Sequence, residues 1–157
     1  MKYAQRLKTR YQRTMDTLHH VDHSYRMKSR QKRSAIEPSL VTVVDDDESV
    51  RESLPDLLRE FGFAARAFSS AEEFLASHCV GETRCLILDI AMPGMSGPEL
   101  QRELKLRRRD IPIVFITGQR DEAVRPRVLE QGAVECLFKP FSDTALLEAL
   151  TLALRVD

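Results

Sequence analysis

Polar side chains of three kinds follow the apolar runs of this sequence. They are Asp45, Asp46, Asp47, Asp89, Thr117 and Lys139. Clustered carboxylates repel one another unless a cation lies among them. Oxygen ligands without His or Cys beside them favour Mg²⁺, which takes one or two carboxylates, water and a phosphate oxygen. An Asp can also act as a nucleophile toward phosphorus, while Lys and Thr bind the phosphate oxygens. The set predicts phosphoryl transfer onto a carboxylate, driven by positioning and charge neutralisation.

These side chains meet only if the elements that carry them end at one edge of a sheet. Apolar runs predict strands at 40–44, 63–68, 85–89, 111–117 and 134–138. Helical spacing of apolar residues predicts helices between and after them, at 48–61, 70–77, 99–106, 121–130 and 142–154. This alternation predicts a doubly wound α/β fold, (βα)5, with a five-stranded parallel sheet whose ligands bind at the carboxyl ends of the strands.

Two prolines fall inside these predicted helices. Pro55 removes a backbone donor, and we expect it to cost a hydrogen bond or to kink the helix 48–61. Pro126 lies inside the helix 121–130 unless that helix begins late, because a proline is tolerated in a first turn. In either case we expect the segment 119–126 to be loosely ordered.

The balanced charge of the chain, 24 Lys and Arg against 24 Asp and Glu, is the sum of two unlike segments. Residues 1–38 hold ten basic and three acidic residues, a formal charge of +7. Residues 39–157 hold 14 basic and 21 acidic residues, a formal charge of −7. Sustained apolar periodicity also begins near Pro38. We therefore expect a basic, disordered tail over 1–38 and a globular domain of ordinary size over 39–157.

The basic tail has three interpretations. It is a disordered segment without a role, or it includes residues upstream of the natural start at Met15 or Met27, or its charge binds an acidic partner, a nucleic acid or a membrane surface. Tyr3, Tyr11 and Tyr25 interleave with the basic residues and permit stacking on bases. The disordered segment is the favoured interpretation, and nucleic acid is not expected as a partner.

Composition excludes several classes of protein. No apolar run approaches the ~20 residues that cross a bilayer, and the N-terminus lacks the apolar core of a secretory signal. Three cysteines without a C-x-x-C pair argue against a disulfide framework and against a zinc ribbon. The tail histidines have no evident partner ligands for a metal; they are His19, His20 and His23. We expect a cytoplasmic protein.

Four segments resemble the response-regulator receiver domain of bacterial two-component signalling. They are VTVVDDDESVRESL (41–54), LILDIAMPGMSGPEL (86–100), IPIVFITG (111–118) and GAVECLFKPF (132–141). Their order and spacing are specific, and the resemblance covers residues 40 to about 155. It implies a flavodoxin-like fold and a phosphorylation-dependent signalling switch that is not an enzyme, although it assists its own phosphotransfer and slow autodephosphorylation.

The resemblance also implies a phosphoacceptor and a metal site. Asp89 is the implied acceptor of a phosphoryl group from a sensor histidine kinase or a phosphotransfer protein. Asp45 and Asp46 are the implied acidic pair for Mg²⁺, one binding it directly and one through water. Asp89 itself and the backbone carbonyl of Ala91 are the other implied ligands.

Further roles follow from the same resemblance. Thr117 supplies a hydroxyl that turns toward the phosphate, and Lys139 pairs with the phosphoryl oxygens and precedes a cis peptide bond to Pro140. Cys136 stands at the switch position, where receivers usually carry Tyr or Phe, so the switch is expected to work without a large rotating ring. Asp47 matches no required position and is expected to cap the first helix.

The expected output is a protein contact. The sequence stops directly after the last predicted helix without a helix-turn-helix pattern, which favours a single-domain regulator with a downstream protein target. The expected contact surface is the face formed by the fourth helix, the fifth strand and the fifth helix. The same face is expected to form a homodimer, if one exists. The alternatives are an unphosphorylated adaptor module and a nucleic-acid-associated regulator that acts through the basic tail.

Two related chemistries fit less well. A haloacid-dehalogenase-like phosphatase needs a second Asp two residues after the nucleophile, where this sequence has Ala91. A flavin-binding module of similar topology needs a hydroxyl- and glycine-rich phosphate loop after the first strand. This sequence has DDDES there, which would repel an anion.

Overall fold

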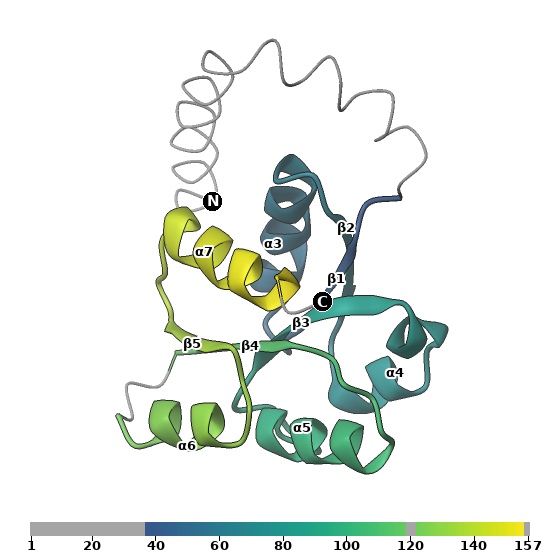
Figure 1. Ribbon diagram of the computed structural model, residues 1–157, viewed down its shortest axis with the longest axis vertical. Coiled ribbons are helices and arrows are strands. Elements are labelled where there is room, and N and C mark those ends of the chain that lie inside the picture. The colour runs from purple at the N-terminus through teal and green to yellow at the C-terminus, as the bar shows by residue number, and fades with distance from the viewer. Residues whose placement is uncertain (1–36, 119–121, 156–157) are drawn as a thin grey trace, which may run out of the picture.

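The sheet of this protein is fully parallel, with the strand order β2-β1-β3-β4-β5 (Figure 1). The structure is a computed structural model, and it describes residues 37–118 and 122–155. The strands are β1 (Leu40–Val44), β2 (Ala64–Phe68), β3 (Thr83–Asp89), β4 (Ile113–Thr117) and β5 (Glu135–Phe138). This order is that of the flavodoxin-like doubly wound sheet, so the predicted fold class is confirmed.

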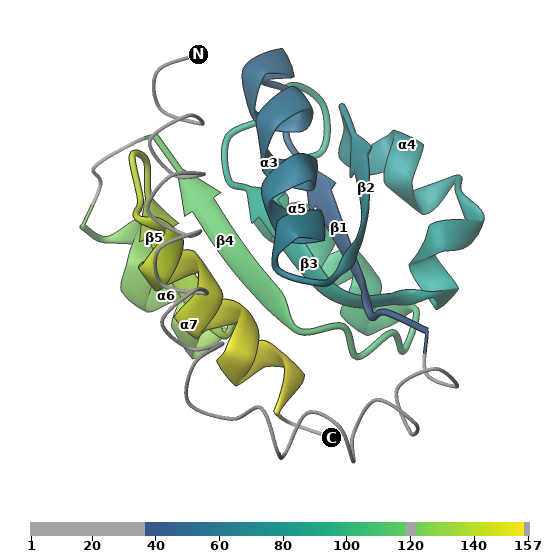
Figure 2. The same cartoon turned by 90° about the horizontal axis from the view of Figure 1, so that it is seen from above.

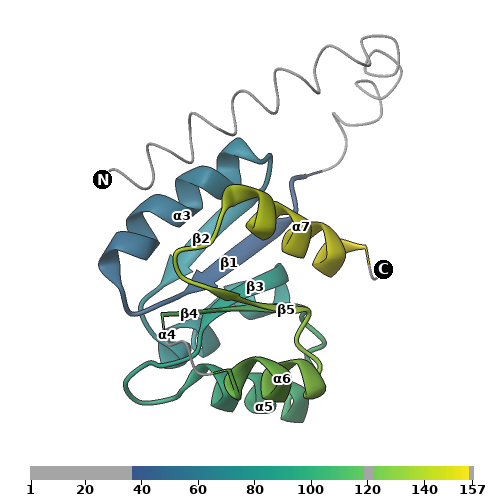
Figure 3. The same cartoon turned by 90° about the vertical axis from the view of Figure 1, so that its left-hand side faces the viewer.

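Helices cover both faces of the sheet, as the view in Figure 3 shows. They are α3 (Glu48–Glu60), α4 (Ala71–Leu75), α5 (Gly97–Leu106), α6 (Val124–Glu130) and α7 (Asp143–Leu154), with a 3₁₀ turn, η1 (His78–Gly81). Helices α3 and α7 lie over one face (Figure 2), and α4, α5 and α6 lie over the other. None of the helices within 37–118 and 122–155 is long and apolar enough to cross a membrane.

Two apolar layers explain why the strands read as continuous apolar runs. One layer joins Phe74, Leu100 and Val128 of α4, α5 and α6 to residues of the sheet. The other joins Leu58 of α3 and Leu150 of α7 to its opposite face. Successive side chains of a strand point to opposite faces, so a strand covered on both sides is apolar at most positions.

The helix ends differ from the sequence prediction in several places. Helix α4 ends at Leu75, and η1 follows it where no element is predicted. Helix α5 begins at Gly97, two residues early, because Ser96 accepts a hydrogen bond from the Glu99 amide as its cap. Helix α6 begins late at Val124, which puts Pro126 in its first turn, one of the two predicted possibilities.

Pro55 lies within α3, which runs through it without interruption. Its ring is buried beside Leu54, Leu57 and Leu58, so apolar burial offsets the lost hydrogen bond. The expected tail over 1–38 lies almost wholly outside the described residues, as do residues 119–121 of the segment expected to be loosely ordered.

The strand order reverses between β1 and β3, which are neighbours in the sheet. The chain leaves β1 toward one edge of the sheet, through α3 to β2, and then returns across β1 to β3 and moves toward the other edge. A doubly wound sheet opens a crevice at this point, outside the carboxyl ends of the strands. Residues that end or follow β1, β3, β4 and β5 therefore share one edge.

Candidate functional site

Asp45 follows β1 and is fully buried. Its Oδ1 accepts a hydrogen bond from the Asp47 amide at 2.9 Å, and its Oδ2 accepts one from Nζ of Lys139 at 2.8 Å. The Arg51 guanidinium also donates to the backbone carbonyl of Asp45 at 3.0 Å. A buried carboxylate is stable only when hydrogen bonds and a countercharge replace water, and Asp45 has both.

Asp89 ends β3, the central strand, and is only 6% exposed. Each of Asp45, Asp46 and Asp89 offers a carboxylate oxygen, and these oxygens lie within 4.8 Å of one another. Oδ1 of Asp89 stands 3.9 Å from Nζ of Lys139. The sheet therefore brings together three acids and one cation, of which Asp45 and Lys139 are 94 positions apart in the chain.

The environment of Asp89 disfavours its charged form. Burial raises the pKa of Asp89 to about 7, and the nearby charge of Asp45 is the second cause of this rise. Lys139 opposes this rise, and Asp46 adds to it through a hydrogen bond and its charge. A cation among these carboxylates would relieve the repulsion and favour ionised Asp89.

Thr117 and Lys139 flank the acidic cluster on the strands beyond β3. Thr117 ends β4 and is 1% exposed, and Lys139 directly follows β5. The Lys139 amide donates to the Thr117 carbonyl at 2.8 Å, which fixes the two residues side by side. The peptide bond between Lys139 and Pro140 is cis, as predicted.

Asp47 belongs to the helix and not to the cluster, as predicted. Its Oδ1 accepts hydrogen bonds from the Ser49 amide at 2.9 Å and from the Ser49 hydroxyl at 2.7 Å. These bonds, the hydroxyl one foremost, hold the pKa of Asp47 below its usual range. Asp47 thus caps α3, since its carboxylate replaces a missing backbone acceptor at the helix start.

Cys136 lies in the middle of β5 and is 2% exposed. It packs in the same apolar layer as Phe115, Val128 and Ala133. Burial raises the pKa of its thiol, so the sulfur stays protonated and serves as a small apolar group. The switch position is therefore part of the core beside α6.

The loop between β3 and α5 depends on two residues that sequence reasoning passed over. A Cβ at Gly97 would lie 2.3 Å from the backbone oxygen of Asp89, so only glycine fits there. Oε1 of Glu72, on α4, accepts a hydrogen bond from the Met95 amide at 2.7 Å. The M-P-G-M-S-G-P run indicated a loop but not its distant partner. Both residues hold the segment that follows Asp89.

The donor set fits a hard divalent cation. Three carboxylates at one edge supply the oxygen ligands and negative charge that Mg²⁺ prefers. Ala91 is exposed two residues beyond Asp89, and its carbonyl remains a predicted ligand. With Lys139 and Thr117 alongside, the edge can neutralise a transferring phosphoryl group and offers one carboxylate to receive it.

Known proteins share this sequence pattern. A family model described as the response regulator receiver domain matches residues 41–151. Nodulation protein W of Bradyrhizobium diazoefficiens is 44% identical over 119 residues, which cover 76% of this chain and 52% of that protein. Response regulator protein TodT of Pseudomonas putida is 41% identical over 118 residues, covering 75% and 52%. The chain spans about half the length of the curated relatives it matches.

Solved structures agree with the sequence comparisons. The crystal structure of FixJ-N superimposes with a TM-score of 0.70 at 39% identity, covering 78% of this chain and 98% of that one. The response regulator StyR superimposes with a TM-score of 0.70 at 46% identity, covering 76% and 60%. The order of strands, the acidic edge and these likenesses agree, and the chain belongs to the response-regulator receiver family of two-component signalling proteins.

Proposed function

We propose that the domain receives a phosphoryl group on Asp89 from a phosphohistidine of a sensor histidine kinase or a phosphotransfer protein. The observation that carries this proposal is the position of Asp89. It ends the central strand, its carboxylate lies within 4.8 Å of those of Asp45 and Asp46, and Lys139 stands 3.9 Å away. No other described carboxylate combines that strand end with this set of neighbours.

Asp45, Asp46 and Asp89 would hold Mg²⁺, together with the predicted carbonyl of Ala91. The bound cation would supply charge neutralisation for the carboxylates and for a phosphate oxygen. The three carboxylates offer only hard oxygen ligands, which supports Mg²⁺ over a softer metal.

The transfer itself uses groups of this chain. An oxygen of ionised Asp89 forms a bond to phosphorus while the bond from phosphorus to the donor imidazole nitrogen breaks, and the electron pair leaves with that nitrogen. The ammonium of Lys139 already pairs with Asp45 and would also donate to the phosphoryl oxygens. The Thr117 hydroxyl would turn toward the same oxygens. Slow autodephosphorylation is a separate step, in which a water oxygen bonds to phosphorus while the bond from phosphorus to the Asp89 oxygen breaks, so inorganic phosphate leaves and the carboxylate is restored.

The output is proposed to be contact with a downstream protein, through the face of α6, β5 and α7, which also suits a homodimer. Leu152 of α7 is 51% exposed, which supports an apolar contact there. Residues 1–38 are proposed to be a separate basic tail, and the cytoplasm is the proposed location.

Acetyl phosphate and intact-mass spectrometry test the proposed function. With Mg²⁺ the wild-type chain should gain one phosphoryl group, and with a chelator in place of Mg²⁺ it should gain little. Asp89→Asn should gain none. Asp47→Asn is the matched control, because Asn also caps a helix and Asp47 faces Ser49. Equal labelling of the Asp89→Asn chain would contradict the proposal.

A further inference from the structure

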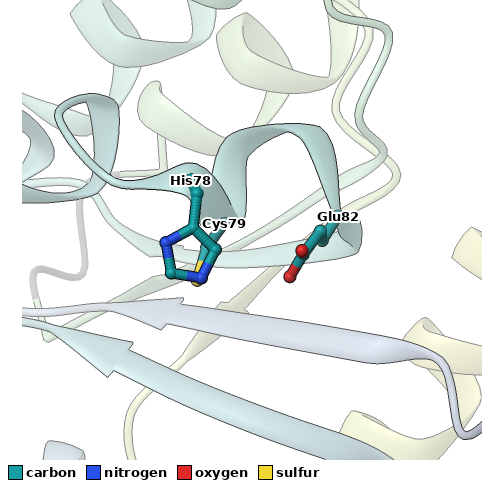
Figure 4. A group of neighbouring side chains, drawn as sticks. All are labelled: His78, Cys79 and Glu82. Atoms are coloured by element: carbon teal, nitrogen blue, oxygen red, sulfur yellow. The ribbon is translucent and has the colours of Figure 1, made fainter.

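A second group of metal-ligating side chains lies far from Asp89, on the turn η1 and on the residue that directly follows it. His78, Cys79 and Glu82 each offer one ligand atom, and these atoms lie within 4.8 Å of one another. Figure 4 shows the imidazole and the carboxylate on the same side of the turn, with the sulfur close to the imidazole ring. Since η1 leads into the start of β3, the group lies at the opposite end of the strand that Asp89 closes.

Local hydrogen bonds fix the turn that carries these donors. The Ser77 hydroxyl accepts from the Cys79 amide at 3.2 Å. The Cys79 carbonyl accepts from the Glu82 amide at 3.1 Å and from the Thr83 hydroxyl at 2.7 Å. Side chains three residues apart eclipse each other on a 3₁₀ turn, which places Cys79 and Glu82 on one face. The donors are therefore held together by the backbone before any ion binds.

The mixture of donors selects a class of metal. A thiolate and an imidazole suit Zn²⁺ and Co²⁺, whereas Mg²⁺ and Ca²⁺ take oxygen ligands. The thiolate and the carboxylate together balance the charge of a divalent ion. Three protein ligands leave a fourth tetrahedral position for water or for a side chain of a partner.

We propose that His78, Cys79 and Glu82 form a binding site for a zinc-class divalent ion. Binding forms a metal–sulfur bond while the thiol proton passes to solvent, and no oxidation state changes. Cys79 is 4% exposed and packs against the core, whereas His78 and Glu82 are exposed. The ion would therefore reach the sulfur from the solvent side, between the other two ligands.

Arg109 is a cationic residue that lies close to this turn. Its Nη1 would lie 3.9 Å from a Cβ at Gly81, within the same turn. A guanidinium there repels a cation, so Arg109→Gln should tighten binding several-fold at low salt.

Cobalt titration of the full chain tests the site. In every protein that is titrated, His19, His20 and His23 are replaced by Asn, so that they cannot bind Co²⁺. Excess Mg²⁺ is added to occupy the carboxylates near Asp89. Co²⁺ should produce a thiolate-to-metal charge-transfer band in the near ultraviolet, and Zn²⁺ should displace it. Cys79→Ala should abolish the band. His78→Gln and Glu82→Gln should each weaken binding by at least about 10-fold.

Matched controls separate this site from other thiols and carboxylates. Cys136→Ala removes another buried cysteine, and Glu52→Gln removes another exposed acid; both should keep the band and the affinity. Zn²⁺ should also raise the thermal unfolding midpoint of the wild-type chain, and at the same Zn²⁺ concentration it should raise that of the His78→Gln and Glu82→Gln chains by less. These two positions are exposed, so the two substitutions should leave the fold intact. Absence of the band, its survival in Cys79→Ala, or unchanged affinity in the two exposed variants would overturn the proposal.

Discussion

The ammonium of Lys139 donates a hydrogen bond to the carboxylate of Asp45 across the edge of the sheet, at 2.8 Å. Asp45 is fully buried, whereas the Lys139 side chain is a quarter exposed. The same ammonium stands 3.9 Å from Asp89, too far for a hydrogen bond. Lys139 is therefore committed to Asp45 in this state, and a phosphoryl group on Asp89 would compete for it.

Removal of this ammonium should be costly. Lys139→Met leaves the carboxylate of Asp45 buried without its countercharge, and we expect a loss of about 3 kcal/mol in the free energy of unfolding. Arg125→Met is the control, because Arg125 pairs with Glu135 at 2.8 Å on the surface and should cost less than about 1 kcal/mol. Urea unfolding in Mg²⁺-free buffer measures both. Equal losses would mean that the buried pair contributes no more than the surface pair.

Stability without Mg²⁺ should fall as the pH rises toward neutrality. The pKa of Asp89 is about 7 in the folded chain, mainly because of burial, whereas an unfolded Asp titrates near ~4. Between these values the folded state binds more protons, so the free energy of unfolding decreases with pH. From pH 5 to pH 7.5 we expect Asp89 to account for a loss of about 2.5 kcal/mol in the free energy of unfolding.

Asp89→Asn should remove that part of the pH dependence and stabilise the chain at pH 7.5. Asp47→Asn should leave it in place, since the lowered pKa of Asp47 concerns only lower pH. Urea unfolding at the two pH values compares the three proteins. An identical slope in the wild-type and Asp89→Asn chains would show that Asp89 ionises normally.

Gly97 lies so close to the backbone of Asp89 that a methyl group at this position should not fit. In Gly97→Ala the new Cβ would lie 2.3 Å from the Asp89 carbonyl oxygen and 3.0 Å from the ring of Phe115. We expect a loss of about 2 kcal/mol or more in the free energy of unfolding. Gly118→Ala has open space around its Cβ and should change little. Equal stability of the Gly97→Ala and Gly118→Ala chains would contradict the close contact between Gly97 and the Asp89 carbonyl oxygen.

The hydrogen bond between Glu72 and the Met95 amide should protect that amide from exchange. Glu72→Gln replaces a charged acceptor by a neutral one, which weakens the hydrogen bond. Hydrogen exchange of the Met95 amide should therefore become faster. Glu73→Gln is the control, because Glu73 accepts from the Ser69 hydroxyl. Amide exchange followed by nuclear magnetic resonance reads the Met95 position directly. Faster exchange in both variants, or in neither, would contradict the assigned partner.

Sequence reasoning predicted the alternation of elements and the residues at the strand ends, for one physical reason. Strands buried on both faces are apolar at most positions, so a polar residue that closes an apolar run marks the end of the strand. Val44 before Asp45 and Leu88 before Asp89 show this most clearly. In a parallel sheet those ends share an edge, which made the cluster predictable from single positions.

Helix boundaries and distant partners could not be predicted in this way. Nothing in the local pattern of His78 to Glu82 specifies a 3₁₀ turn, because its side chains follow no helical periodicity. Helix α3 continues through Pro55 because packing against the sheet outweighs a local preference. The partnership of Glu72 with Met95 spans 23 residues and depends on tertiary structure.

The position of the modified residue in the phosphorylated chain identifies the phosphoacceptor. The chain is treated with acetyl phosphate and Mg²⁺, the acyl phosphate is reduced with borohydride, and peptides are sequenced by tandem mass spectrometry. Reduction of an aspartyl phosphate leaves homoserine in place of Asp. Homoserine is expected at position 89 and unmodified Asp at positions 45, 46 and 47. Homoserine at any of those three positions, or none at position 89 in a chain that has gained a phosphoryl group, would contradict the assignment of Asp89 as the phosphoacceptor.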